Sequence, residues 1–123
     1  MKKIVVIWAS NNPEKYGNKI VKDLVKKWYD VIPVNPKEIE IEWIKVFENL
    51  EKINIDFDII NFVVPPKVTL QILQKFKKLL KNKKIWIQPG AENDEVENYL
   101  KNNNFSDYIT KSCIMIEDLN LQK

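Results

Sequence analysis

The chain has 123 residues, a formal net charge of +3 and 45% hydrophobic residues, enough for one core of ordinary size. It has no histidine and one cysteine, Cys113, which excludes an internal disulfide, a cysteine-based zinc cluster and the usual histidine base. No apolar run approaches the roughly 20 residues of a membrane helix, and Met1–Lys3 leads into a strand-like run without a signal-peptide cleavage site. We expect a single-domain, metal-free, cytoplasmic protein.

The positive charge does not by itself indicate a nucleic-acid partner. All 20 basic residues are lysines, and most of them lie beside acidic residues on expected helix faces. A nucleic-acid-binding surface more often combines arginine with exposed aromatic residues. We therefore interpret the lysines as solvated helix faces. Seventeen isoleucines, fourteen asparagines and the absence of arginine are typical of an AT-rich coding sequence.

Short apolar runs alternate with amphipathic segments along the whole chain. The first half predicts a strand over Lys3–Ile7, a helix over Asn18–Lys27 and a strand over Tyr29–Val34; residues 37–55 are less regular, and a short helix fits Glu48–Ile53. The second half predicts a strand over Asp58–Val64, a helix over Lys67–Lys81, a strand over Lys84–Gln88, a helix from Asn93 to about Lys101, a strand over Phe105–Ile109 and a closing helix over Ile114–Leu121. This alternation, with strands apolar on both faces, predicts an α/β fold: a three-layer, Rossmann-like, doubly wound parallel sheet of five strands, ordered 3-2-1-4-5.

Special residues follow four of these strands, where ligands bind in such sheets. The four segments are Ala9-Ser10-Asn11-Asn12-Pro13, Asn35-Pro36, Val64-Pro65-Pro66 and Gln88-Pro89-Gly90. We expect them to converge on one crevice; the alternative is that the prolines merely end the strands. The first segment leads into a helix, whose N–H groups and dipole favour an anion, although Trp8 occupies the place where a phosphate-binding turn prefers glycine.

A dinucleotide oxidoreductase is disfavoured by three features. The G-x-G-x-x-G motif is absent, and Asn35-Pro36 follows the second strand where an acidic residue would hold the ribose. We also expect no second domain that would hold a substrate against a nicotinamide ring. A nucleotide-bearing ligand remains compatible with the sequence, whereas redox chemistry is disfavoured.

The run from Ala9 to Gly17 resembles the first phosphate loop of the small stand-alone CoA-binding proteins, which have a Rossmann fold and are similar to the CoA-binding domain of the succinyl-CoA synthetase alpha subunit. Further matches follow in order: Val31-Ile32-Pro33-Val34-Asn35-Pro36, Asp58 with Val64-Pro65-Pro66, Trp86-Ile87-Gln88-Pro89-Gly90-Ala91, and Cys113 with Glu117. The resemblance implies one CoA-binding domain over 1–123. It places Ala9, Ser10, Asn11 and the helix starting near Gly17 at the diphosphate, with charge from Lys15; Asn35, Pro36 and Lys37 near the adenosine; Val64, Pro65 and Pro66 along the wall; and Gln88 on the far side.

We expect non-catalytic binding of coenzyme A or an acyl-CoA, without a nucleic-acid or membrane partner. Cys113 is interpreted as a small core residue rather than a nucleophile or a partner for the CoA thiol, because no histidine is present to activate it. Glu117 is interpreted as a surface or cap residue, and Asp56 and Asp58 do not resemble an acid/base pair. A regulatory or partner-binding protein that senses CoA and, less favoured, an NAD- or nucleotide-binding enzyme stay open as alternatives.

Three tryptophans occupy positions where that family has glycine: Trp8, Trp28 and Trp43; Trp86 falls where the family often has tryptophan. Position 28 follows a helix, a usual place for a left-handed glycine. The chain has only 2 glycines, against roughly 7% of residues on average. The codon UGA is read as tryptophan in one alternative code and as glycine in another, so we hypothesise that these three residues are glycine codons. The alternative is three independent substitutions, which would block or repurpose the pocket.

Overall fold

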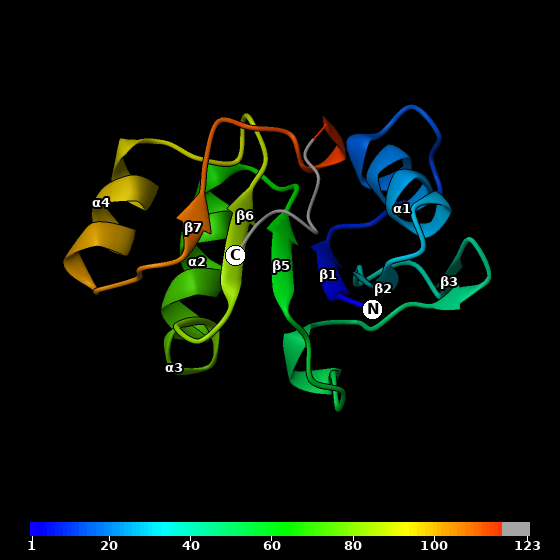
Figure 1. Ribbon diagram of the computed structural model, residues 1–123, viewed down its shortest axis with the longest axis horizontal. Coiled ribbons are helices and arrows are strands. Elements are labelled where there is room, and N and C mark those ends of the chain that lie inside the picture. Colours follow the sequence, from blue (N-terminus) through cyan, green and yellow to red (C-terminus); the bar gives the residue numbers. More distant parts are fainter. Residues whose placement is uncertain (117–123) are drawn as a thin grey trace.

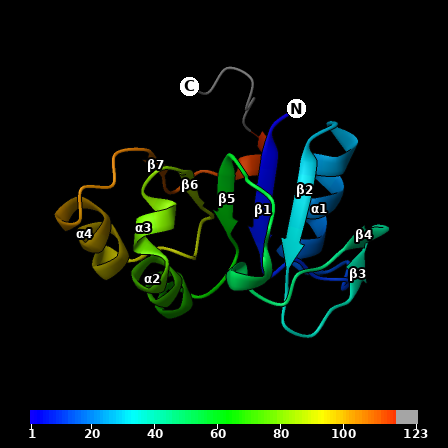
Figure 2. The same cartoon turned by 90° about the horizontal axis from the view of Figure 1, so that it is seen from below.

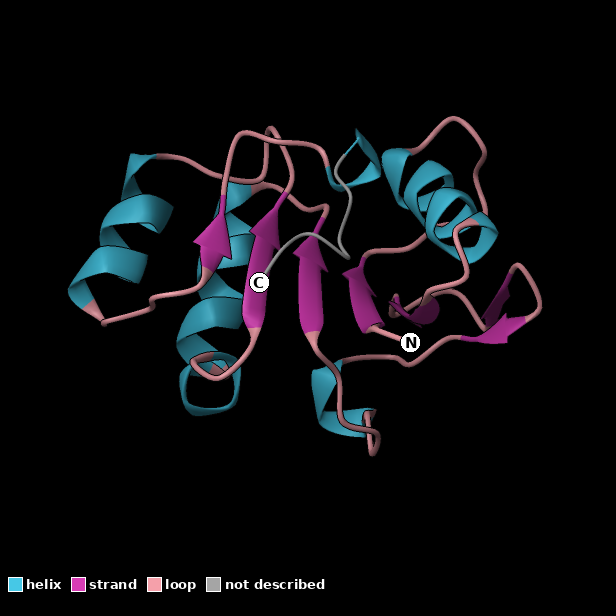
Figure 3. Cartoon of the chain, viewed as in Figure 1, coloured by secondary structure: helices cyan, strands magenta, loops and turns pink. Residues whose placement is uncertain are grey.

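The computed structural model describes residues 1–116 and contains a five-stranded parallel sheet (Figures 1 and 3). Its strands stand in the order β2-β1-β5-β6-β7. Their bounds are Lys3–Ile7 for β1, Asp30–Val34 for β2, Ile59–Phe62 for β5, Lys84–Ile87 for β6 and Tyr108–Ile109 for β7. Every neighbouring pair is parallel, so all carboxyl ends lie at one edge of the sheet.

Helices cover both faces of the sheet, which confirms the predicted three-layer architecture (Figure 2). On one face α1 (Tyr16–Lys26) buries Ile20, Val21 and Leu24 against the alternate strand residues Ile4 and Val6. On the other face, α2 (Pro66–Lys75), α3 (Lys77–Leu80) and α4 (Asp94–Asn102) cover the remaining apolar strand residues. Because each strand is covered on both sides, its side chains are apolar without alternation.

The predicted strand order 3-2-1-4-5 is wrong. The third long strand, β5, pairs with β1, with Val5 opposite Ile60, so the order in the predicted numbering is 2-1-3-4-5. The reason lies at the outer edge of β2, where the following segment already pairs: Phe47 N–H donates to Pro33 O and Asn35 N–H donates to Phe47 O. The chain must then return past β1. The point at which strand order reverses therefore lies between β1 and β5, where ligands bind in such sheets.

Several local elements differ from the predictions. Residues 37–55 contain an unpredicted hairpin, β3 (Glu40–Ile41) and β4 (Ile44–Lys45). The 3₁₀ helix η1 (Leu50–Lys52) that follows lies within the short helix predicted over Glu48–Ile53. The helix predicted over Lys67–Lys81 is divided at Phe76, whose φ is −111°. Of the segment predicted as a closing helix, Ile114–Ile116 form the 3₁₀ helix η2, and the remaining predicted positions, with Glu117, lie outside the described residues. None of the helices within residues 1–116 has the length and hydrophobicity needed to span a bilayer.

Candidate functional site

Three adjoining cavities lie at the carboxyl ends of β1, β2, β5 and β6. The loop cavity, about 630 Å³, is lined by Trp8, Ser10, Lys15, Tyr16, Gly17, Asn35, Pro36, Lys37, Glu38, Val63 and Pro65. The proline cavity, about 470 Å³, is lined by Tyr16, Val63, Val64, Pro65, Pro66, Gln88, Pro89, Gly90, Ala91 and Cys113. The helix cavity, about 370 Å³, includes Ile7, Trp8, Val34, Pro36, Leu50, Val64, Val68, Ile72 and Lys75. The loop and proline cavities share three lining residues, so they form one crevice at the switch point.

The N-terminus of α1 faces this crevice without a cap. Its N-cap residue, Lys15, makes no side-chain capping bond, and the first turn contains no acidic residue. The N–H groups of Tyr16 and Gly17 have no hydrogen-bond partner within the described residues. By contrast, α4 is capped by Asn93, whose Oδ1 accepts from Val96 N–H at 2.9 Å, and has three acids in its first turn. The α1 terminus thus keeps its donors and its positive dipole end for an external anion.

Two asparagines hold the loop that precedes α1. The buried Asn18 donates from Nδ2 to Ser10 O at 2.8 Å. Asn35 donates from Nδ2 to Ala9 O at 2.8 Å, and its Oδ1 accepts from Lys37 N–H. Because both functions of the Asn35 amide are bonded within the protein, this residue positions the loop while lining the cavity.

Gly17 allows α1 to approach the end of β1. A β-carbon at this position would lie 2.3 Å from the Trp8 carbonyl oxygen, which no side chain tolerates. The helix therefore packs directly on the turn at residues 8 and 9. This is the close helix–strand contact that a glycine provides in phosphate-binding folds.

Trp8 stands in the wall shared by the loop and helix cavities. It has a φ of 68° and is 39% exposed, and its N–H donates to Val34 O at 2.8 Å. The expectation that its indole blocks the pocket is not met, since the loop cavity remains open beside it. The indole instead lies between two cavities that both reach Pro36.

A carboxylate already occupies one donor of the loop. Glu38 Oε2 accepts from the backbone N–H of Asn11 at 2.7 Å, and Glu38 also lines the loop cavity. Lys15 and Lys37 line the same cavity. The loop cavity thus combines two ammonium groups with one carboxylate that an anionic ligand would displace or face.

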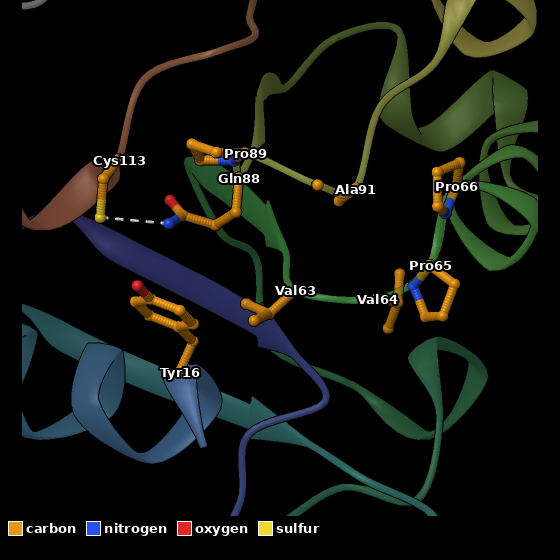
Figure 4. A pocket seen from close by; sticks show the side chains of 10 residues that line it. Tyr16, Val63, Val64, Pro65, Pro66, Gln88, Pro89, Ala91 and Cys113 are labelled. Atoms are coloured by element: carbon orange, nitrogen blue, oxygen red, sulfur yellow. Dashed lines mark hydrogen bonds between the residues drawn. The ribbon is translucent and has the colours of Figure 1, made fainter. Parts of the chain in front are cut away.

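The proline cavity is more apolar and ends at a polar cluster. In Figure 4, Tyr16, Gln88 and Cys113 gather at one end, and Pro65 and Pro66 lie at the other. Gln88 donates from Nε2 to Cys113 Sγ at 3.2 Å, while its Oε1 accepts from Asn61 Nδ2 and from Ile114 N–H. The interpretation of Cys113 as a core residue is therefore wrong: it is half-buried and lines the cavity.

An ion pair lies at the rim of the helix cavity. Lys75 Nζ lies 2.8 Å from Glu51 Oε1, and this hydrogen bond, together with the charge of Lys75, lowers the pKa of the Glu51 carboxyl. Both side chains are more than half exposed, so the pair contributes little to stability.

The structure brings together most of the residues that the sequence predicted for the site. Ten of the twelve line at least one of the three cavities: Ser10, Lys15, Gly17, Asn35, Pro36, Lys37, Val64, Pro65, Pro66 and Gln88. Ala9 and Asn11 line none of them. Ala9 is buried and accepts from Asn35, and Asn11 donates from Nδ2 to Glu40 O, so both shape the loop instead.

Sequence reasoning missed Tyr16, Glu38 and Val63. Tyr16 lies within the run from Ala9 to Gly17, where only its neighbours Lys15 and Gly17 were assigned to the site. Val63 adjoins the segment that starts at Val64, and Glu38 directly follows Lys37. Their proximity to predicted site residues was the available signal.

Comparisons with known proteins identify similar sequences and similar folds. The sequence profile of a family described as CoA binding domain matches residues 2–118. A solved conserved hypothetical protein of Pyrococcus furiosus is 43% identical with a TM-score of 0.87, covering 96% of this chain and 100% of that one. A hypothetical protein of Pyrococcus horikoshii is 30% identical with a TM-score of 0.83, covering 98% and 83%.

One curated relative is a much longer protein. The alpha subunit of the ADP-forming acetate–CoA ligase II of Pyrococcus furiosus is 38% identical over 73 residues, which cover 57% of this chain but only 16% of that subunit. The match therefore reaches one part of the ligase. Together with the profile that matches nearly the whole sequence, these relatives show that the chain belongs to the CoA binding domain family.

Proposed function

We propose that this protein binds coenzyme A or an acyl-CoA in the crevice between β1 and β5, without catalysing a reaction on it. The observation that carries the proposal is the uncapped N-terminus of α1, which faces the switch point of the sheet with Lys15 beside it. The ligase subunit that matches this chain is named for its use of CoA, which supports the same ligand.

The loop cavity suits the diphosphate. Free N–H groups at Tyr16 and Gly17 point their donors outward, and Lys15 and Lys37 supply positive charge. Charge-assisted hydrogen bonds from such groups to phosphate oxygens are stronger than neutral ones. The adenosine part would then lie toward Asn35 and Pro36, at the end of β2.

The proline cavity suits the pantetheine arm. Val63, Val64, Pro65 and Pro66 give it an apolar wall, and Gln88 supplies amide chemistry at its far end. A mostly apolar groove with a few polar groups is typical of sites for small ligands. The thiol or acyl end would lie toward Gln88 and Cys113.

The absence of catalysis is proposed from the available side chains. The chain has no histidine to serve as a general base. Cys113 contacts Gln88, an amide that cannot take its proton. The protein would accordingly hold the thioester without cleaving it.

Calorimetric titration with CoA, acetyl-CoA, NAD and ATP tests the ligand, on the chain with tryptophan at position 8 and on Trp8→Gly. We expect CoA or acetyl-CoA to bind more tightly than NAD and ATP. Lys15→Ala should weaken CoA binding about tenfold, because a charge-assisted bond of about 1.4 kcal/mol is lost. Lys22→Ala on the same helix is the matched control, since Lys22 is exposed and lines none of the three cavities.

Tighter binding of NAD or ATP, or no CoA binding by either form, would overturn the proposal. Incubation of the protein with acetyl-CoA tests the absence of catalysis. Free thiol measured over time should appear no faster than in buffer. Thiol release proportional to protein concentration would show that the protein is an enzyme.

A further inference from the structure

We infer that residues 8, 28 and 43 are glycines in the protein made by its source organism, whose ribosomes read the codon UGA as glycine. All three tryptophans have left-handed backbone, with φ of 68°, 69° and 65°. Bulky residues rarely adopt this conformation, which glycine adopts freely. Each of the three lies in a different kind of turn, and each kind prefers glycine at that position.

Trp28 ends α1 in a Schellman motif. The N–H of Trp28 donates to Val25 O, and the N–H of Tyr29 donates to Leu24 O, both at 3.0 Å. In this motif the residue after the C-cap is left-handed and is usually glycine. The indole does not explain the choice of residue, because Trp28 is 81% exposed.

α4 also ends in a Schellman motif, but its left-handed residue is an asparagine, which tolerates this conformation. Asn104 N–H donates to Lys101 O, Phe105 N–H donates to Leu100 O, and Asn104 has a φ of 62°. Asparagine is the usual substitute for glycine in left-handed backbone. At the equivalent position after α1, the chain has tryptophan instead of glycine or asparagine.

Trp43 is the second residue of a two-residue hairpin loop. Ile41 pairs with Ile44, and the loop residues Glu42 and Trp43 have φ of 49° and 65°. Positive φ at both positions is the signature of a type I′ turn, in which glycine is strongly preferred at the second loop position. The Trp43 side chain is 94% exposed.

Trp8 forms the turn that leads from β1 toward α1. Its carbonyl oxygen lies where a β-carbon on Gly17 would clash, so the backbone at both positions is tightly constrained. Glycine is preferred in such a turn because a ligand phosphate must approach its backbone.

The fourth tryptophan, Trp86, differs from the other three in its packing and in its backbone conformation. Trp86 is completely buried in β6, and its Nε1 donates to Ser112 O at 2.8 Å. It is absent from the left-handed residues. Six non-glycine residues of the described chain have positive φ: Trp8, Trp28, Glu42, Trp43, Asn104 and Lys111. Three of these six are tryptophans, although only four of the 123 residues are tryptophan. One recoded codon explains all three tryptophans, whereas chance requires three independent substitutions.

The recoding also changes the proposed ligand site. With glycine at position 8, no indole separates the loop and helix cavities, which both reach Pro36, and the backbone of the turn is open to a phosphate. This consequence rests on the proposed function. The identity of residues 28 and 43 does not.

Two measurements test the identity of the residues. Sequencing of the gene should find UGA at codons 8, 28 and 43 and UGG at codon 86. Mass spectrometry of protein isolated from the source organism should find glycine in the tryptic peptides 4–15, 28–37 and 38–45, and tryptophan in peptide 85–101. UGG codons, or tryptophan in the first three peptides, would overturn the inference.

Titration with CoA tests the consequence for the site separately. Trp8→Gly should bind CoA about tenfold more tightly than the tryptophan form, while Trp28→Gly and Trp43→Gly should leave the affinity unchanged. An unchanged affinity in Trp8→Gly would overturn the effect on the site. Glycine peptides combined with no CoA binding by any form would uphold the recoding and refute the proposed function.

Discussion

Replacement of Trp28 by glycine is expected to stabilise the protein, although it removes the largest side chain. Trp28 is 81% exposed, so little packing is lost with the indole. Its φ of 69° places the backbone of Trp28 in the left-handed region, where the Cβ atom lies too close to the following carbonyl oxygen. Trp43, which is 94% exposed, meets the same conditions in the β3–β4 hairpin.

The expected gain follows from two opposing contributions. Left-handed backbone costs a residue with a Cβ about 1–2 kcal/mol. Glycine gives back about 0.5–1 kcal/mol, because it loses more backbone freedom on folding. The net gain is about 0.5–1 kcal/mol per site. The two turns are separate, so the double variant should gain about 1–2 kcal/mol, or roughly 4–8 °C in Tm for a domain of this size. At Trp8 the half-buried indole offsets such a gain, so position 8 is left out of the test.

Urea unfolding and thermal melts should be compared across Trp28→Gly, Trp28→Ala and Asn104→Gly. Alanine retains the Cβ, so Trp28→Ala should remain less stable than Trp28→Gly by about 0.5–1 kcal/mol. Asn104→Gly should change little, because asparagine tolerates the conformation. If Trp28→Gly is no more stable than Trp28→Ala at an unchanged m-value, backbone strain at this turn is absent and the reasoning fails.

Four further outcomes are expected. Gly17→Ala should lower the free energy of unfolding in urea by about 2 kcal/mol, because its β-carbon would lie 2.3 Å from the Trp8 carbonyl oxygen. Gly90→Ala should lower it by only about 1 kcal/mol, because Gly90 has a positive φ but faces open space. Equal losses in the two variants would contradict the clash at Gly17. Glu38→Gln should bind CoA about threefold more tightly in calorimetry, because a carboxylate beside the polyanion is removed; weaker binding would mean that Glu38 serves the ligand. Trp86→Phe should cost about 2 kcal/mol in thermal melts, since the Ser112 carbonyl loses a donor and a space remains; a neutral effect would refute its structural role. Lys75→Gln should raise the pKa of Glu51 toward its ordinary value in an NMR titration, because Lys75 lowers that pKa. The stability that the ion pair contributes is present near neutral pH and is lost as the pH falls through the lowered pKa of Glu51. An unchanged pKa of Glu51 would show that the pair does not form in solution.

The four segments that follow the strands at the crevice could be predicted because strand ends leave local signals. Prolines and small polar residues follow apolar runs at Ser10, Pro36, Pro65 and Gln88, and parallel strands bring such ends to one edge whatever their order. The role of Cys113 could not be predicted in this way. Its exposure depends on where the segment after β7 crosses the crevice, a contact between residues 25 positions apart.

The hydrophobic pattern could not predict the strand order for a related reason. Orders 3-2-1-4-5 and 2-1-3-4-5 both satisfy right-handed crossovers and apolar strands. The bonds between Phe47 and the edge of β2 decide between them, and they come from a hairpin whose strands are only two residues long. Such short strands carry no periodic signal.

Local chemistry in the sequence alone determined the alternation of strands and helices, the parallel sheet and the preference for glycine at positions 8 and 28; position 43 was indicated only by the family resemblance. These properties depend on neighbouring residues, through hydrophobic period and turn stereochemistry. Only the tertiary structure decided that β5 lies beside β1, that Glu38 accepts a hydrogen bond from the loop before α1 and that α1 keeps free donors beside Lys15. Each of these requires the packing of segments far apart in the chain, where many arrangements share the same local preferences and long-range contacts select one of them.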